Sequence, residues 1–195
     1  MKKQGLIWAI PLMALLVILA ETLTAHQELS GGQAAPETSG FKEFADCVEK
    51  YEKIHKEAEK SLPALKKRSE QELIAAQQEG LVNKIRELRS DAQRGDIFTP
   101  SATEAIARAI KAVFTGPAAH RVRNTIQAGE PLEGFKVQVN QRYPDGMPRT
   151  TVPPTLLQKL PRLPDEVAYR ILGSTLLLVD RKANMIVDFM PNAIP

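Results

Sequence analysis

Glu52, His55 and Glu59 are residue types that ligate metals, and they stand three and four positions apart. In a helix this spacing places the three side chains on neighbouring turns of one face, within reach of a shared divalent cation. Lys56 lies beside them and opposes a cation, and helices rich in Glu and Lys produce such triplets by chance. Two interpretations stay open: the three residues form a metal site, or His55 replaces an apolar residue in the apolar stripe of the helix.

Residues that could support catalysis are few. None of His26, His55 and His120 lies in a run that resembles a nucleophile elbow, a metalloprotease helix or a phosphate-binding loop. Ser174, His120 and an aspartate could be combined into a triad, but Gly173 and Ser174 are more simply a hairpin turn. We therefore predict no catalytic residue, no cofactor and no enzyme, with an unrecognised hydrolase as the third alternative.

Acidic residues and a cysteine offer two further candidates. Asp180 and Asp188 flank a predicted turn and strand, either as an acidic pair or, as we expect, as solvated acids. Because Cys47 is the only cysteine of the chain, an internal disulfide and a cysteine-based zinc cluster are excluded. We expect Cys47 to be a half-buried thiol on a helix.

A candidate for protein binding lies in the sequence FKVQVNQ, residues 135–141. Phe135, Val137 and Val139 alternate with polar residues, which predicts a strand with one solvated face. An exposed edge strand can accept a strand of a partner through main-chain hydrogen bonds. Lys136 is equally typical of a charge that discourages such pairing.

The composition sets limits on the partners. The 195 residues carry a formal charge of +3, and 25% of them are charged. Nucleic-acid binding needs Lys and Arg gathered on one surface, whereas here the positive residues are mixed with acids. We therefore expect no nucleic-acid partner, and membrane contact only through the N-terminal segment.

The N-terminal segment has the three parts of a secretory signal. Lys2 and Lys3 precede an apolar run at 6–20, and small and polar residues follow as far as Ala25. We predict a signal peptide at 1–25, with an uncleaved membrane anchor as the alternative. A flexible linker follows at 26–40, rich in Gly, Ser and Pro. The protein is then exported, to the periplasm or the extracellular space.

The elements that must position these residues are mostly helices. Apolar residues at intervals of three and four predict helices at 41–62 and 69–94, which form a charged helical hairpin within residues 41–100. A third helix begins at Thr99, Pro100 or Ser101 and ends at Thr115, and a fourth covers 118–128. A brief helix is expected at 155–160.

The C-terminal residues predict a small sheet. Runs of strand length at 168–172, 175–179 and 185–189 are separated by turn residues, which is typical of a three-strand antiparallel meander. Such a sheet needs an apolar face covered by other elements. We therefore expect an α+β fold in which residues 101–195 form a small domain and upstream helices cover the sheet.

This C-terminal region resembles the RcnB-like family, periplasmic proteins linked to nickel and cobalt homeostasis. The resemblance rests on short motifs that recur in the same order: Gly129-Glu130-Pro131-Leu132, Leu160-Pro161, Leu163-Pro164, Tyr169-Arg170 followed by Gly173, Leu178-Val179-Asp180 and Ile186-Val187-Asp188. It implies the family's sheet and compartment. No tract rich in histidine accompanies the motifs, so the metal role does not transfer residue by residue.

Together these observations predict an exported, non-catalytic accessory or binding protein of the cell envelope. Its expected partner is another protein of the envelope. A metal-homeostasis factor of the RcnB-like kind is the alternative.

Overall fold

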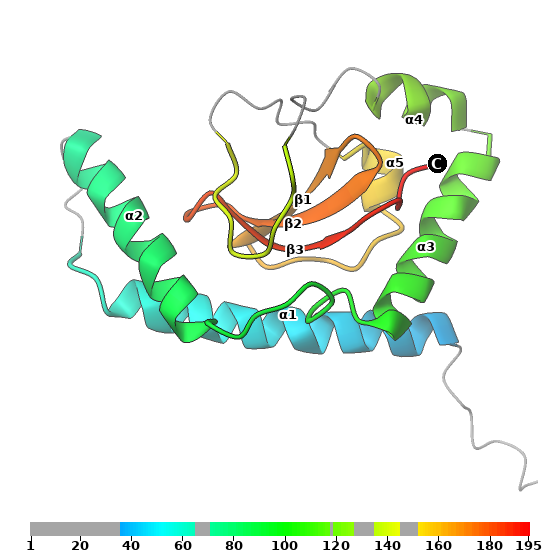
Figure 1. The fold of residues 1–195 in the computed structure, drawn as a ribbon. Coiled ribbons are helices and arrows are strands. Elements are labelled where there is room, and N and C mark those ends of the chain that lie inside the picture. Colours follow the sequence, from blue (N-terminus) through cyan, green and yellow to red (C-terminus); the bar gives the residue numbers. More distant parts are fainter. Residues whose placement is uncertain (1–35, 65–70, 118, 127–134, 145–151) are drawn as a thin grey trace, which may run out of the picture. The chain divides into compact units, whose positions relative to one another are not determined.

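A computed structural model describes residues 36–64, 71–117, 119–126, 135–144 and 152–195 of the chain (Figure 1). All of them belong to one compact unit, Ala34–Pro195. The predicted signal peptide at 1–25 and most of the predicted linker at 26–40 lie outside the described residues.

The first helix, α1 (Pro36–Lys60), begins before the point that the sequence predicted. It includes the last five residues of the predicted linker. Gly40, which we had assigned to that linker, is buried in the helix, and α3 lies so close that a Cβ at this position would stand 2.4 Å from the carbonyl oxygen of Ser101. Glycine here permits close contact between two helices and does not mark a flexible segment.

Four more helices follow: α2 (Gln71–Leu88), α3 (Pro100–Thr115), α4 (Ala119–Ile126) and α5 (Pro154–Leu157). Helix α2 ends before Arg94, where we had predicted its end, and turns lead from it to Gly95, whose φ is +95°. Helix α3 is capped by Thr99, whose side chain accepts a hydrogen bond from the Ala102 amide, and Pro100 occupies its first turn.

The predicted meander is confirmed. Strands β1 (Val167–Leu172), β2 (Thr175–Asp180) and β3 (Met185–Met190) form an antiparallel sheet in the order β1-β2-β3. The register of β2 and β3 shifts between Leu178 and Val179, which is a bulge that places Val187 as an extra residue. Five helices and this sheet, counted over the described residues, make the predicted α+β fold.

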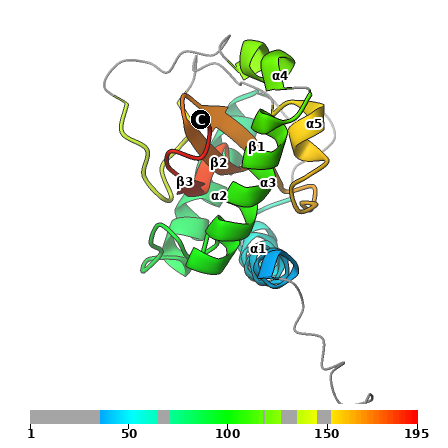
Figure 2. The ribbon, with the colours of Figure 1, turned by 90° about the vertical axis from the view of Figure 1, so that its right-hand side faces the viewer.

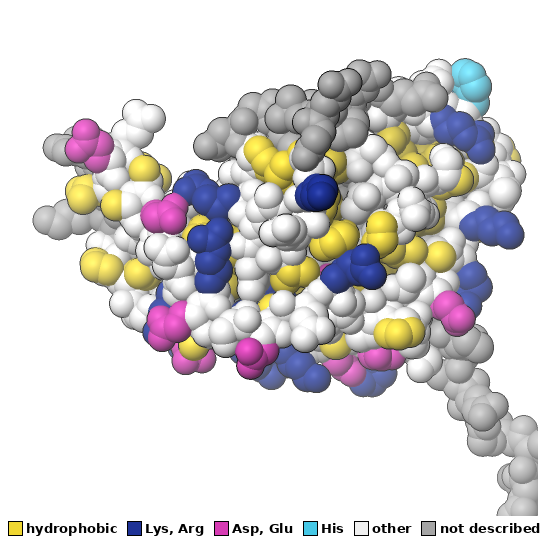
Figure 3. Space-filling model, viewed as in Figure 1, with side chains coloured by type: hydrophobic (Ala, Val, Ile, Leu, Met, Phe, Trp, Pro, Cys, Tyr) yellow, Lys and Arg dark blue, Asp and Glu magenta, His cyan; other side chains and the backbone are white. Residues whose placement is uncertain are grey.

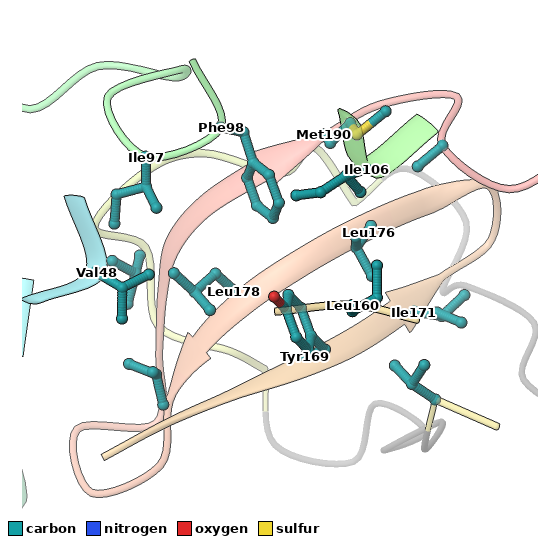
Figure 4. Close-up of a cluster of buried hydrophobic side chains, with 14 of the residues drawn as sticks. Val48, Ile97, Phe98, Ile106, Leu160, Tyr169, Ile171, Leu176, Leu178 and Met190 are labelled. Atoms are coloured by element: carbon teal, nitrogen blue, oxygen red, sulfur yellow. The ribbon is translucent and has the colours of Figure 1, made fainter. Parts of the chain in front are cut away.

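One face of the sheet carries the main core. Tyr169, Ile171, Leu176 and Leu178 project from β1 and β2 toward the helices, as Figure 4 shows. They meet apolar side chains from other elements: Val48 of α1, Ile97 and Phe98 of the segment before α3, Ile106 of α3 and Leu160 after α5. Helix α1 runs along this face, and α3 rises beside the sheet (Figures 1 and 2).

The same core joins the two regions that we had separated at residue 100. Helix α1 packs along α3 more extensively than along α2, and Tyr51 and His55 of α1 bond to Asp180 of β2. Residues 41–100 therefore share their apolar core with residues 101–195. Charged side chains of both signs cover the outer side of α1, along the lower edge of Figure 3.

The strand predicted at 135–140 does not form. Residues 135–138 have no regular structure, and Asn140 adopts a φ of +60°, which a continuous strand does not accommodate. Phe135 and Val137 instead pack against a second apolar cluster on the other face of the sheet, which we call the outer face: Tyr143, Leu172, Leu177, Val179 and Ile186. The Asn140 amide donates to the Ile186 carbonyl of β3, and the Tyr143 amide donates to the Asn184 carbonyl just before β3. Residues 140–143 therefore line the edge of β3.

Candidate functional site

The carboxylate of Asp180 is fully buried at the end of β2, contrary to our expectation of a solvated acid. Its Oδ2 atom lies 2.6 Å from the Tyr51 hydroxyl, which donates to it, and 2.5 Å from Nδ1 of His55. Its Oδ1 atom accepts from the Ala183 amide at 2.7 Å. Burial, and next the charge of Asp180, hold the pKa of Tyr51 well above its ordinary value. Asp180 thus fastens α1 to the sheet.

Asp188 is the second buried acid, and the prediction that it is solvated is also wrong. Its carboxylate accepts from the backbone amides of Gly95, Ile97 and Phe98 at 2.8–3.0 Å and from the Phe189 amide at 2.8 Å. These donors hold the segment between α2 and α3 on β3. These four amides satisfy both oxygens of the Asp188 carboxylate within the protein.

Arg89, which directly follows α2, is a third buried charged residue. Its guanidinium donates to Asn140 Oδ1 at 2.9 Å and to the Val187 carbonyl at 3.3 Å, and it lies 5.1 Å from the centre of the Tyr51 ring. Asn140 returns a hydrogen bond from its amide to the Arg89 carbonyl. Burial lowers the pKa of Arg89. These contacts tie α2 to residues 138–141, so they too are internal.

The members of the proposed metal triplet have different partners in the structure. His55 is fully buried, and its Nε2 atom has no hydrogen-bond partner and lies 3.8 Å from Glu59. Glu59 pairs with Lys182 at 2.7 Å, whereas Glu52 pairs with Lys56. Throughout the described parts of the chain, no group of three or more His, Cys, Asp or Glu side chains is placed to hold a metal ion.

The remaining predicted residues lie apart from one another. Ser174 is exposed in the β1–β2 turn, while His120 is exposed on α4 beside Asn124, and no hydrogen bond joins Ser174 to His120. The turn at Gly173, with a φ of +56°, is the predicted hairpin turn. Cys47 is half-buried on α1 as expected, and burial raises the pKa of its thiol.

The edge of β1 differs from that of β3. Leu172 pairs with Thr175 across the two-residue turn, and the Arg181 amide donates to the Glu166 carbonyl. In this register Ala168, Arg170 and Leu172 direct their main-chain groups to β2. Tyr169 and Ile171, which alternate with them, direct their main-chain groups away from β2. No strand in the described parts of the chain pairs with this side of β1.

An apolar hollow of about 260 Å³ lies along the helix-covered side of β1. Its walls are mainly apolar: Val152, Leu157, Pro161, Leu163, Val167 and Tyr169, with Arg162, Ala168 and Arg170 completing the lining. Leu157 of α5 is 44% exposed and is one of three large apolar side chains exposed in the described residues, with Leu73 and Ile74 of α2.

A polar hollow of about 410 Å³ lies on the outer face of the same strand. Arg170 and Arg181 line it together with Gln78, Tyr143, Ala168, Val179, Asp180 and Asn184. Asp180 is the one acid among these residues, and both of its oxygens accept hydrogen bonds from groups of the protein. The two hollows share Ala168 and Arg170 of β1.

Comparison of the chain with protein-family models, with curated proteins and with solved structures found no match. Among the described helices, none has the length and apolar character needed to cross a membrane.

The sequence predicted a docking edge at Phe135, Val137 and Val139. In the structure Phe135 and Val137 pack on the outer face of the sheet, and the residues after them line β3. The apolar hollow beside β1 was missed because its lining comes from α5, from the residues that follow it and from β1, and no local pattern shows that these lie together.

Proposed function

We propose that this protein is a non-catalytic accessory protein that binds another protein at the apolar hollow beside β1. The observation that supports this most strongly is the hollow itself, which has a volume of about 260 Å³, is lined mainly by apolar side chains and includes Leu157, which is 44% exposed. An apolar side chain of a partner can enter such a hollow and is withdrawn from water there.

The buried ionisable groups support a binding function over a catalytic one. Asp180, Asp188 and Arg89 each contact several groups of the protein itself, and these contacts join helices to the sheet. A catalytic acid or base must reach a substrate within hydrogen-bond distance. These three buried charged groups are therefore engaged in holding the fold together.

The proposed place of action is the cell envelope or the exterior. It rests on residues 1–25, where positive residues, an apolar run and small residues follow one another as in an exported protein. The proposed partner is accordingly an envelope protein. The alternative proposal, an RcnB-like metal-homeostasis factor, would be favoured if calorimetric titration with nickel or cobalt produced binding heat that His55→Ala abolished.

Site-specific photo-crosslinking tests the proposal in the full chain. A photoreactive phenylalanine at Leu157 lies at the apolar hollow, and the same residue at Leu73 is the matched control, since Leu73 is an exposed leucine on α2. We expect a discrete protein adduct from position 157 that is absent from position 73. The same adducts at both positions, or an adduct at position 73 alone, would count against the apolar hollow as the binding site.

A further inference from the structure

The apolar hollow beside β1 has walls that are fixed within the protein. The Tyr169 hydroxyl donates to the Pro161 carbonyl at 3.2 Å, and this bond joins β1 to the segment that follows α5. Burial raises the pKa of Tyr169, so the hydroxyl keeps its proton and stays a donor. Pro161 and Pro164 restrict the backbone on either side of Leu163. Because a preformed site loses little conformational entropy when it is filled, this hollow suits a binding role.

The size and lining of the hollow define what it can hold. Pockets for drug-sized molecules have volumes of about 300–1,000 Å³. The hollow, at about 260 Å³, is smaller and suits one large side chain. Val152, Leu163 and Val167 supply apolar walls, and Leu157 lines the hollow while it is exposed to solvent. An apolar side chain that enters would leave water and would cover Leu157 as well.

The charged residues beside the hollow are positive. Residues 154–164 carry two charges, Lys159 and Arg162, and Arg162 lines the hollow. Both side chains are exposed, and within the described part of the chain neither has a hydrogen bond or an ion pair. Arg170, which also lines the hollow, is engaged within the protein, and no acidic residue is among the described lining residues. A carboxylate of a bound segment would therefore meet an available guanidinium, whereas a basic residue would be repelled.

Building on the proposed function, we infer that the partner binds through an acidic segment that carries one large apolar side chain. The apolar side chain enters the hollow and covers Leu157. The acidic residues next to it in the partner pair with Arg162 and Lys159.

Three labelled peptides test this inference with the full chain, and fluorescence anisotropy measures their binding. The first peptide has a central phenylalanine with glutamates on both sides, the second has lysines in place of the glutamates, and the third has alanine in place of the phenylalanine. We expect the first peptide to bind at least about tenfold more tightly than the second, since the lysines place like charges beside Arg162. It should also bind at least about tenfold more tightly than the third, which has no large side chain to bury.

Substitution of Arg162 tests the charged part of the site. Arg162→Gln should weaken binding of the first peptide about threefold or more, as expected for an exposed ion pair. The matched control is Arg121→Gln, which removes an exposed arginine from α4 and should leave binding unchanged. Equal binding of the first peptide and either of the others, or equal effects of the two substitutions, would overturn the inference. If no peptide binds while the adduct at Leu157 persists, this inference fails and the proposed function stands.

Discussion

Replacement of Asp188 by asparagine should destabilise the protein strongly. In the folded chain Oδ1 accepts from the amides of Gly95 and Phe189, and Oδ2 accepts from those of Ile97 and Phe98. Asparagine keeps one acceptor oxygen, so its amino group must face two of these N–H donors. Hydrogen bonds to charged groups contribute roughly 1.5–3 kcal/mol each, so two lost bonds cost about 3–6 kcal/mol. A domain is stable by only about 5–15 kcal/mol, and such a loss is a large fraction of it.

Urea unfolding at neutral pH, followed by circular dichroism, measures this effect as a change in the free energy of unfolding. Asp91→Asn is the matched control, because Asp91 is exposed in the turns after α2, and its replacement should change stability by less than about 0.5 kcal/mol. A loss below about 1 kcal/mol for Asp188→Asn would show that the four amides do not depend on the carboxylate, and would refute the reasoning.

Two further predictions concern α1. Gly40→Ala should destabilise the protein by about 1–3 kcal/mol although alanine favours helices, because its Cβ would stand 2.4 Å from the Ser101 oxygen. Gly80→Ala, whose Cβ would meet only a flexible leucine side chain at 3.1 Å, should be neutral or stabilising when both are compared by urea unfolding. A destabilised Gly80→Ala with an unaffected Gly40→Ala would contradict this account. Because burial and Asp180 hold the pKa of Tyr51 well above 10.0, the unfolded chain ionises first, and the free energy of unfolding should fall as pH rises through about 10. Tyr51→Phe should make this fall shallower in unfolding curves measured from about pH 8 to 11; an unchanged slope would contradict the assignment.

Elements set by neighbouring residues were predictable from the sequence. The meander follows from strand-length apolar runs separated by Gly173 and Asn184, and the start of α3 follows from Thr99 and Pro100. In each case the residues that decide the structure lie within a few positions of one another. The buried face of α3 was predictable for the same reason, since its apolar spacing follows the helix period.

Features that depend on distant residues were not predictable. Asp180 is buried because Tyr51, 129 positions away in the sequence, donates to it, and no local pattern shows this pairing. Helical spacing placed Ile74 on an apolar stripe of α2, yet its side chain is 52% exposed. Periodicity shows which residues share a face but not whether another element covers that face. The close contact of Gly40 with α3 was not predictable either, because it depends on Ser101 of another helix.

The central claim, that a partner protein binds at the apolar hollow beside β1, is tested most directly by the affinity of the full chain for the protein captured at position 157. The account predicts that Leu157→Asp, which places a charge at the hollow, weakens binding about tenfold or more, whereas Leu73→Asp on α2 leaves it unchanged. Equal affinities of the two variants for this partner would contradict the account.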